Sequence, residues 1–247
     1  MDESLLLSFG DLEERHWWFV VRRKIVVDEI LRQLPTSSPY VLEVGCGAGG
    51  LLRVLGGLLP GATALKGVEP NDAAVRNATA LGCDVASGTF ERLPQQDRSV
   101  DLLIALDVLE HCEDDVAAGR EALRVLKPGG AFVLTVPALM SLWGPHDEIN
   151  AHYRRYTRRS LQTALERSGL TLERITYFNT LLLPIGYLTR IFARLTGSRA
   201  ATGVDLPPLA LNAALTGVFS VERPWLRRAG LPVGMSLMAV ARKPAQG

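Results

Sequence analysis

A glycine-rich segment carries the clearest chemistry in this sequence. The apolar run 41–44 contains a carboxylate, Glu43, and glycine fills four of the next six positions: 45, 47, 49 and 50. Residues 51–55 then have the apolar spacing of a helix that buries one face. A tight turn between strand and helix needs glycine, because glycine adopts positive φ and lets a ligand approach the backbone. Since the helix start presents unpaired N–H groups, the segment suits a nucleotide-like ligand.

The spacing of these residues fits two templates. Gly45, Gly47 and Gly50 match the G-x-G-x-x-G fingerprint of dinucleotide-binding folds. Glu43, Gly45, Gly47 and Gly49 match acid-x-G-x-G-x-G, and here the stretch resembles the motif of class I S-adenosylmethionine (SAM) methyltransferases. Glu43 favours the second template, because a carboxylate at the end of an apolar strand is costly unless it is paired. The ammonium group of SAM would pair with it, whereas a dinucleotide pyrophosphate would be repelled.

Further motifs continue this resemblance along the chain. Glu69 ends a second apolar segment twenty residues after Gly49, where doubly wound folds place the carboxylate that binds ribose hydroxyls. Residues 88–94 are similar to the family segment that covers adenine, although Thr89 stands where the family usually has an acid. The segments D-x-x-x-x-x-D-V-L-E-H, R-V-L-K-P-G-G and T-V-P follow in the family's order. Residues 40–140 therefore resemble the type 11/12 SAM methyltransferases.

The resemblance implies a cofactor site that takes up SAM and releases S-adenosylhomocysteine. With Thr89 in place of an acid, we expect adenine to be recognised by backbone groups and by the face of Phe90. The residues that we assign to the cofactor are Glu43, Gly45, Cys46, Gly47, Gly49, Glu69, Pro70, Thr89, Phe90, Leu106 and Asp107.

Candidates for catalysis lie just past the fourth and fifth expected strands, since ligands of doubly wound sheets bind at the carboxyl ends of the strands. His111 is the expected general base because histidine titrates near neutrality, and His146 is its rival. Alternatively, His111 only caps a helix and packs on the sheet. Asp107-x-x-Glu110-His111 also resembles the E-x-x-E-H set with which small-RNA and quinone-pathway O-methyltransferases hold a divalent ion. A metal therefore remains an alternative, although the first acid here is Asp.

A basic and aromatic cluster at residues 152–159 is the candidate for binding the methyl acceptor. Arg158 and Arg159 stand at an expected helix start, where they oppose the helix dipole unless an anion lies nearby. Arginine forks bind carboxylates and phosphates, so the cluster suits an anionic acceptor. A solvated basic face is the alternative, and nucleic acid is not expected of a charge-balanced chain. The residues that we assign to the acceptor are Trp17, Trp18, His152, Arg154, Arg155 and Tyr156.

Apolar periodicity predicts the elements that must position these groups. The pattern is doubly wound α/β, a Rossmann-like sheet of seven strands, and the resemblance implies that the last strand is antiparallel. Expected strands are 41–44, 64–69, 83–86, 99–105, 131–136, 170–178 and 235–242. Expected helices are 11–34, 51–55 onward, 71–81, 113–126, 160–168, 181–195 (broken near 184–186) and 207–221, with loops at 141–148 and 197–205.

These elements suggest four parts: an N-terminal helical lid segment (1–38), a SAM-binding core (39–178), an apolar helical cap insertion (179–222) and a return to the sheet (223–247). The composition, 47% hydrophobic and 21% charged over 247 residues, supplies ample core. Three isolated cysteines indicate a reducing compartment, and the uncharged stretch 206–221 falls short of a membrane span. We therefore expect a cytoplasmic protein, with peripheral membrane contact and oligomeric state left open.

The function predicted from the sequence is SAM-dependent O- or C-methylation of a small or lipid-like, anionic acceptor. Two alternatives remain open. The G-x-G-x-x-G coincidence allows an NAD-type oxidoreductase, and the cofactor motifs alone allow a SAM-binding regulatory module without turnover.

Overall fold

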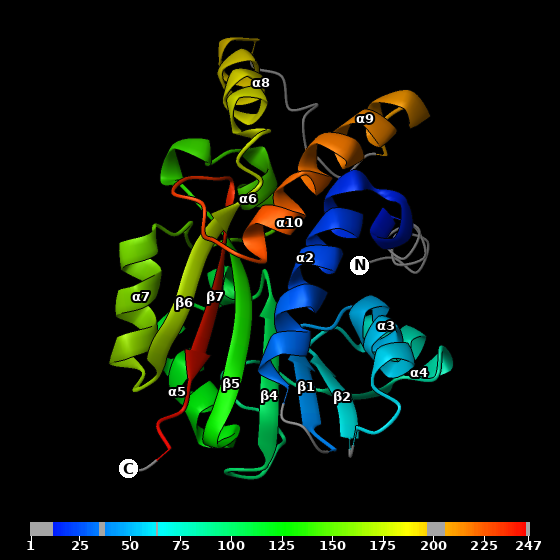
Figure 1. The fold of residues 1–247 in the computed structure, drawn as a ribbon, viewed down its shortest axis with the longest axis vertical. Coiled ribbons are helices and arrows are strands. Elements are labelled where there is room, and N and C mark those ends of the chain that lie inside the picture. The colour runs from blue at the N-terminus through cyan, green and yellow to red at the C-terminus, as the bar shows by residue number, and fades with distance from the viewer. Residues whose placement is uncertain (1–11, 35–37, 63, 197–205, 246–247) are drawn as a thin grey trace.

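A computed structural model describes residues 12–34, 38–62, 64–196 and 206–245 of the chain. In these residues, seven strands form one sheet in the order β3-β2-β1-β4-β5-β7-β6 (Figure 1). Strands β1 to β5 run parallel, whereas β7 pairs antiparallel with both β5 and β6. This confirms the predicted Rossmann-like sheet, with the last strand inserted one place inside the edge. The strands are β1 (Tyr40–Val44), β2 (Ala64–Glu69), β3 (Asp84–Ser87), β4 (Val100–Leu106), β5 (Leu126–Pro137), β6 (Thr171–Phe178) and β7 (Ser236–Arg242).

Two hydrophobic layers cover the two faces of the sheet. Successive residues of a strand point to opposite faces, so in β4 Leu102 joins one layer and Leu103 the other. Because both faces are buried, the strands read as continuous apolar runs. One layer is formed by α2 (Trp17–Gln33), α3 (Gly50–Leu58), α9 (Leu209–Ser220) and α10 (Glu222–Leu226), and the other by α5 (Asp115–Val125) and α7 (Arg158–Arg167). Helix α4 (Asp72–Ala80) packs against β2 and β3.

The N-terminal helix is interrupted at His16, so the prediction of one helix over 11–34 is wrong at this point. Residues 12–15 form a helical turn, the chain bends at His16, and α2 begins at Trp17. The imidazole Nδ1 of His16 accepts a hydrogen bond from the backbone N–H of Trp18 at 3.3 Å, which caps the new helix. Residues 1–11 of the expected lid segment lie outside the described residues.

Two other expectations are corrected in the second half of the chain. The loop expected at 141–148 contains a short helix, α6 (Pro145–Ile149), whose start is held by Asp147: its carboxylate accepts from the N–H of Gly144 at 2.9 Å. Helix α8 (Leu183–Thr196) is not broken. Pro184 lies in its first turn, where the missing N–H has no intrahelical partner to lose. The loop expected at 197–205 lies outside the described residues.

Helices α8 and α9 project beyond the end of the sheet at which the parallel strands finish (Figure 1). Among the described residues, no helix combines the length and apolar character needed to cross a bilayer.

Candidate active site

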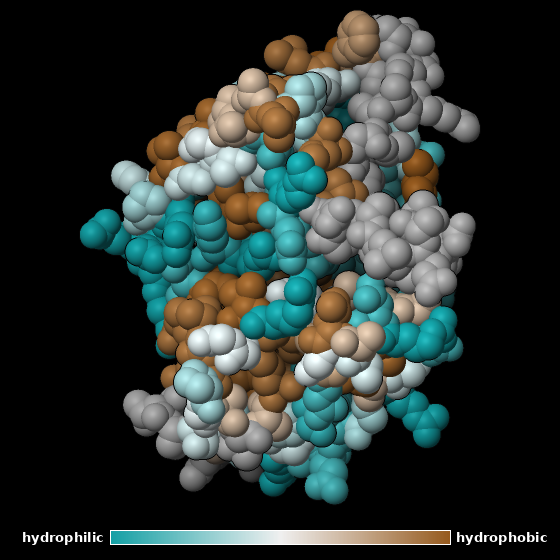
Figure 2. Space-filling model, turned by 90° about the vertical axis from the view of Figure 1, so that its right-hand side faces the viewer, coloured by the Kyte–Doolittle hydropathy of each residue, from teal (hydrophilic) through white to brown (hydrophobic). Residues whose placement is uncertain are grey.

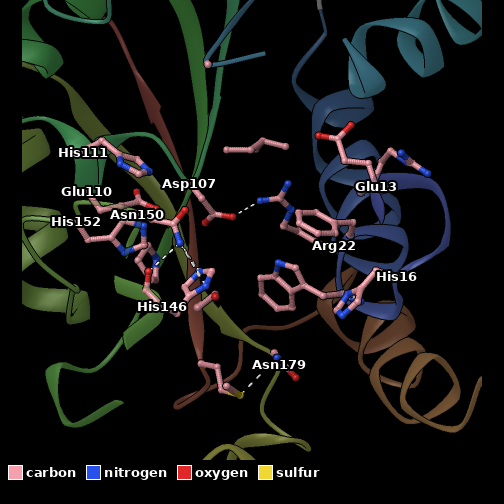
Figure 3. A pocket seen from close by; sticks show the side chains of 18 of the residues that line it. Glu13, His16, Arg22, Asp107, Glu110, His111, His146, Asn150, His152 and Asn179 are labelled. Atoms are coloured by element: carbon pink, nitrogen blue, oxygen red, sulfur yellow. Dashed lines mark hydrogen bonds and ion pairs between the residues drawn. The ribbon is translucent and has the colours of Figure 1, made fainter. Parts of the chain in front are cut away.

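A cavity of about 430 Å³ lies at the carboxyl ends of the parallel strands. One wall comes from α2 and the turn before it, and the facing wall from the segments that follow β4 and β5 (Figure 3). Asn179, Arg190 and Met235 also border it. All four histidines of the chain line this one cavity: His16, His111, His146 and His152.

The glycine turn after β1 closes one end of the cavity. Gly45, Gly47 and Gly49 have φ of +67°, +53° and +78°, values that side chains disfavour. A Cβ on Gly45 would lie 2.5 Å from Val108 Cγ2, and one on Gly49 would lie 2.8 Å from Cys83 Sγ. In front of Gly47 the nearest atom is the Glu13 carboxylate oxygen, at 3.8 Å. Gly45 and Gly49 therefore serve packing, whereas Gly47 leaves room for a ligand to approach.

Glu43 presents a buried carboxylate to the cavity beside this turn. Its side chain belongs to a residue only 4% exposed, and its Oε2 atom has no hydrogen-bond partner among the described residues. Burial, followed by the charge of Glu13, raises the pKa of Glu43 well above its ordinary value, while Arg22 opposes the rise. Such a group is costly until a cation or donor reaches it. The ammonium group of SAM is a suitable partner, so the residues present fit this cofactor.

Glu69 holds the turn through its carboxylate. Its Oε2 accepts from the N–H of Gly47 at 2.9 Å, and its Oε1 accepts from the N–H of Asn71 at 3.0 Å. Phe90 is 3% exposed and packs edge to face on Phe132, with ring centroids 5.9 Å apart, so its face is not open to adenine. The predicted cofactor residues that border the cavity are Glu43, Gly45, Cys46, Leu106 and Asp107; those that do not are Gly47, Gly49, Glu69, Pro70, Thr89 and Phe90.

Asp107 and Arg22 form an ion pair across the cavity, from the end of β4 to α2 (Figure 3). The other carboxylate oxygen of Asp107 accepts from the hydroxyl of Thr135 at 3.1 Å. The guanidinium of Arg22 also lies 5.4 Å from the centre of the Phe19 ring. The sequence indicated Asp107 but not Arg22, whose only signal was its place in the basic run 22–24. A ligand that contacts Asp107 must share it with Arg22.

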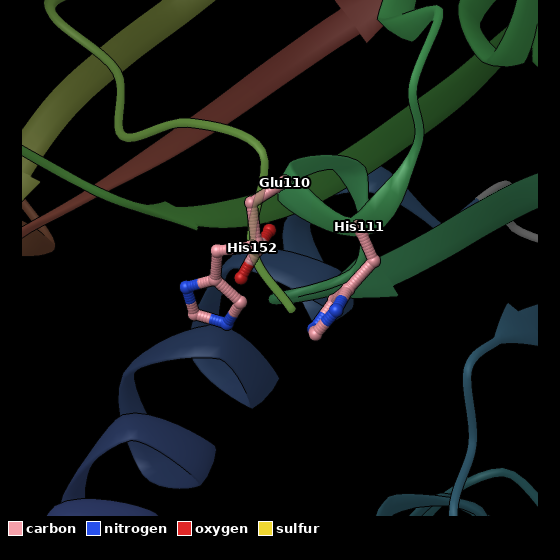
Figure 4. A group of neighbouring side chains, drawn as sticks. All are labelled: Glu110, His111 and His152. Carbon is pink, nitrogen blue, oxygen red and sulfur yellow. The ribbon is translucent and has the colours of Figure 1, made fainter. Parts of the chain in front are cut away.

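Glu110, His111 and His152 converge on the facing wall (Figure 4). Their ligand atoms all lie within 4.8 Å of one another, and the two imidazole rings meet edge to face with centroids 4.6 Å apart. Glu110 is fully buried, and neither carboxylate oxygen has a partner among the described residues. Burial, then the charge of Asp107, raises the pKa of Glu110. One carboxylate and two imidazoles form a donor set that suits a divalent metal.

Asp147 orients two residues of this wall. Its Oδ1 accepts from Nδ1 of His152 at 2.9 Å and from Nε of Arg155 at 2.8 Å. Burial alone would raise the pKa of Asp147, but these bonds hold it well below its ordinary value. The carboxylate is therefore ionised near neutral pH and keeps the His152 proton on Nδ1, which leaves Nε2 as an acceptor. No pattern in the sequence indicates this orienting role.

The two candidate bases differ in their surroundings. Burial, followed by the charge of His152, lowers the pKa of His111, so its imidazole is neutral near pH 7 and can accept a proton. His146 lies beside Asn150, whose amide nitrogen is 3.3 Å from Nδ1, and its ring centroid is 5.9 Å from that of His152. Both candidates border the cavity.

The predicted acceptor residues divide into two groups. Trp17, Trp18, His152 and Arg155 border the cavity. Arg154 instead pairs with Asp115 at 3.1 Å and donates to the carbonyl of Glu113 at 2.6 Å. Tyr156 is 1% exposed and donates its hydroxyl to Asp115 at 3.0 Å. Asp115, at the start of α5, therefore draws Arg154 and Tyr156 away from the cavity.

Comparison with known proteins agrees with this geometry. Residues 42–134 match the family model described as "Methyltransferase domain". A probable S-adenosylmethionine-dependent methyltransferase of Mycolicibacterium smegmatis is 31% identical over 66% of this chain and 62% of its own length. A ubiquinone biosynthesis O-methyltransferase of Methylobacterium nodulans is 33% identical over 41% of this chain and 42% of its own. The matched part of the chain thus spans at most about six-tenths of these relatives.

Solved structures show the same fold at low identity. A possible histamine N-methyltransferase of Thermotoga maritima superposes with a TM-score of 0.62 at 18% identity, covering 98% of this chain and 97% of that one. A putative sarcosine dimethylglycine methyltransferase of Galdieria sulphuraria gives 0.61 at 17%, covering 92% and 87%. Residues 42–134 are therefore similar to the type 11 methyltransferase domain family, and the chain shares the fold of these solved methyltransferase structures.

Proposed function

We propose that this chain transfers the methyl group of SAM to a small or lipid-like, anionic acceptor by O- or C-methylation. The observation that carries the proposal is the buried Glu43 carboxylate, left without a partner on one oxygen, beside a turn in which a Cβ added to Gly47 would lie 3.8 Å from the Glu13 carboxylate oxygen. A cation of the kind that SAM carries offsets the cost of that buried acid. A dinucleotide would instead bring a pyrophosphate close to the Glu43 carboxylate, and the two anionic groups would repel each other.

The residues divide the work of this reaction between the two walls of the cavity. SAM supplies an electrophilic methyl on a sulfonium. Glu43 would hold the ammonium group, while Glu69 keeps the turn in shape and offers its carboxylate to the ribose hydroxyls. His111 would take the acceptor proton, with His146 as the rival base. Glu110, His111 and His152 are also the residues that would hold a metal in the alternative mechanism.

The acceptor would enter between the N-terminal helix and the histidine wall. Trp17 and Trp18 offer apolar surface, and Arg155 offers a guanidinium that is shared with Asp147. We also propose that the segment 179–222 caps this site, because Asn179 and Arg190, at its start and on α8, border the cavity.

Calorimetric titration with SAM tests the cofactor site. We expect Glu43→Gln to weaken SAM binding by about 1–3 kcal/mol, since a charge-assisted bond becomes a neutral one. Glu222→Gln is the matched control: Glu222 is equally buried and also has an unpartnered oxygen, but it does not border the cavity. The control should keep the SAM affinity of the wild type.

Two outcomes would contradict the proposed function. Binding of NADH but not SAM by the wild type would establish the oxidoreductase alternative. SAM binding without release of S-adenosylhomocysteine, across a panel of small and lipid-like acids, would favour the regulatory module.

A further inference from the structure

Helix α8 turns its polar side toward the domain and its apolar side outward. The Tyr187 hydroxyl contacts that of Ser141, and Arg190 lies against Gly144 and borders the cavity. The side chains at 185, 188 and 192 recur at helical spacing on one face, and Ile185, Leu188 and Phe192 are 52%, 65% and 65% exposed. A surface helix of a globular domain normally has the opposite arrangement, with its apolar face toward the core.

Helix α9 also exposes apolar side chains, although its inner side is mixed and buries Phe219 in the core. Its Asn212 points into the domain, where Oδ1 accepts from the N–H of Trp17 at 2.9 Å and Nδ2 donates to the carbonyl of Arg15 at 2.8 Å. Outward, Leu209 and Leu211 are 75% and 51% exposed. On the neighbouring α10, Trp225 is 59% exposed. Large apolar side chains exposed on three helices indicate a surface that water does not normally cover.

These exposed side chains gather at one end of the molecule. Helices α8 and α9 project from the same end of the sheet (Figure 1), and hydrophobic residues are exposed at that end in the space-filling view (Figure 2). The segment that carries the two helices, 179–221, is also basic: its only charged residues are Arg190, Arg194, Arg199 and Asp205, a net charge of 3 − 1 = +2 against +1 for the whole chain.

We propose that α8 and α9 dock this protein on the surface of an anionic phospholipid bilayer. Exposed leucine, isoleucine and aromatic side chains would enter the interfacial region, and the positive net charge of the segment favours an anionic surface. The apolar residues are spread over two projecting helices. A fluid bilayer adapts to such a shape, whereas a protein partner would need a matching groove on each helix. Since no described helix can cross a bilayer, the contact is peripheral.

The docking surface adjoins the cavity, which gives it a role in acceptor supply. Helix α8 contributes Arg190 to the lining, and Asn212 of α9 holds the backbone of Trp17, another lining residue. An acyl or prenyl acceptor could therefore pass from the bilayer to the histidine wall along these helices. This second step rests on the proposed function; docking itself does not.

Flotation with vesicles tests the docking surface. The full chain is mixed either with vesicles of phosphatidylcholine alone or with vesicles in which about one-third of the lipid is phosphatidylglycerol. The fraction of the protein that floats with the vesicles is measured. We expect wild type to float with the anionic vesicles, and Leu188→Asp with Phe192→Asp to lower the partition coefficient by about tenfold or more. Higher salt should weaken wild-type binding, because headgroup attraction is screened.

Leu31→Asp with Leu81→Asp is the matched control, since these leucines, on α2 and just after α4, are 45% and 48% exposed, and this variant should float like wild type. Leu209→Asp with Leu211→Asp repeats the test on α9 if the α8 variant proves unstable. The proposal is overturned if wild type does not float with anionic vesicles, or if both helix variants float as wild type does. It is also overturned if the same substitutions dissociate a dimer in light scattering, because the occupant would then be a second copy. A chain that binds SAM without turnover would still float, so this result is separate from the proposed activity.

Discussion

The imidazole of His111 borders the cavity with another imidazole and an acidic group nearby, and these surroundings decide its charge. Burial and the charge of His152 lower its pKa, and Asp107 opposes them more weakly. A base with a lowered pKa stays neutral to a lower pH. If His111 takes the acceptor proton, we therefore expect kcat to stay constant as the pH falls past the ordinary histidine pKa of 6.5, and to decrease only at lower pH.

Replacing the imidazole tests this role. We expect His111→Ala to lower kcat by about 10²–10⁴-fold and to remove the acidic limb of the pH profile, with SAM affinity nearly unchanged. His146→Ala is the comparison, because His146 borders the same cavity. Parallel losses of SAM affinity and folding stability in His111→Ala would identify a structural residue. A reversible loss of wild-type activity with EDTA would instead favour the metal alternative at Glu110, His111 and His152.

At the scale of residues, the sequence indicates which residue types belong to the site but not which side chains contact one another. Glu43 could be assigned because a carboxylate inside an apolar run is unusual locally. The orienting role of Asp147 could not, since it depends on a turn that brings residue 147 against both His152 and Arg155. Arg154 and Arg155 are neighbours of one type, yet only the second borders the cavity, because Asp115 from another helix pairs with the first.

At the scale of elements, two glycine substitutions can distinguish the cost of backbone strain from the loss of a ligand contact. Gly47 and Gly82 both have positive φ, +53° and +85°, and neither would bring a new Cβ closer than 3.8 Å to another residue. Gly47→Ala and Gly82→Ala should each lower the free energy of unfolding by about 1–2 kcal/mol, the cost of a left-handed side chain.

Only the first change should affect SAM. Neither glycine borders the cavity, but Gly47 belongs to the turn beside Glu43, whereas Gly82 follows the end of α4. We expect calorimetry to show weaker SAM binding for Gly47→Ala and wild-type affinity for Gly82→Ala. Equal affinities in the two variants would show that the cofactor does not approach this turn.

The strands could be predicted well and the helix boundaries less so, for physical reasons. Long buried apolar runs favour strands strongly, so 64–69 matches β2 residue for residue and 41–44 lies within β1. The bend at His16 depends on a side-chain cap, and the unbroken α8 depends on where Pro184 falls in its first turn. A proline in the first turn is tolerated, whereas a proline further inside breaks the helix. The sequence pattern does not locate the start of a helix to within one residue.

At the scale of the whole molecule, the first long helix is tied to the last one. Asp28 of α2 accepts hydrogen bonds from Arg223 and Arg227, at 2.6–2.9 Å, across 195 and 199 residues of sequence. The same pairing joins the helix that lines the cavity to the element next to α9. This clamp of Asp28, Arg223 and Arg227 thus links the cavity wall to the docking surface, and we expect its loss to destabilise both.

This clamp predicts how stability changes with pH. Burial acts to raise the pKa of Asp28, but the hydrogen bonds and charges of the two arginines lower it from 3.8 to about 2. A carboxyl whose pKa is lower in the folded state stabilises the fold above its unfolded pKa, and that contribution disappears as pH falls from about 4 to about 2. At pH 7 we expect Asp28→Asn to lower the free energy of unfolding by about 1–2 kcal/mol, less than the full shift because the arginines are partly exposed. Urea unfolding of both proteins should show this difference above pH 5 and a loss of most of it near pH 2. Asp84→Asn, which removes an exposed pair with Lys66, should change stability little at any pH. A difference that persists undiminished at pH 2 would mean that Asp28 acts through packing and not through its charge.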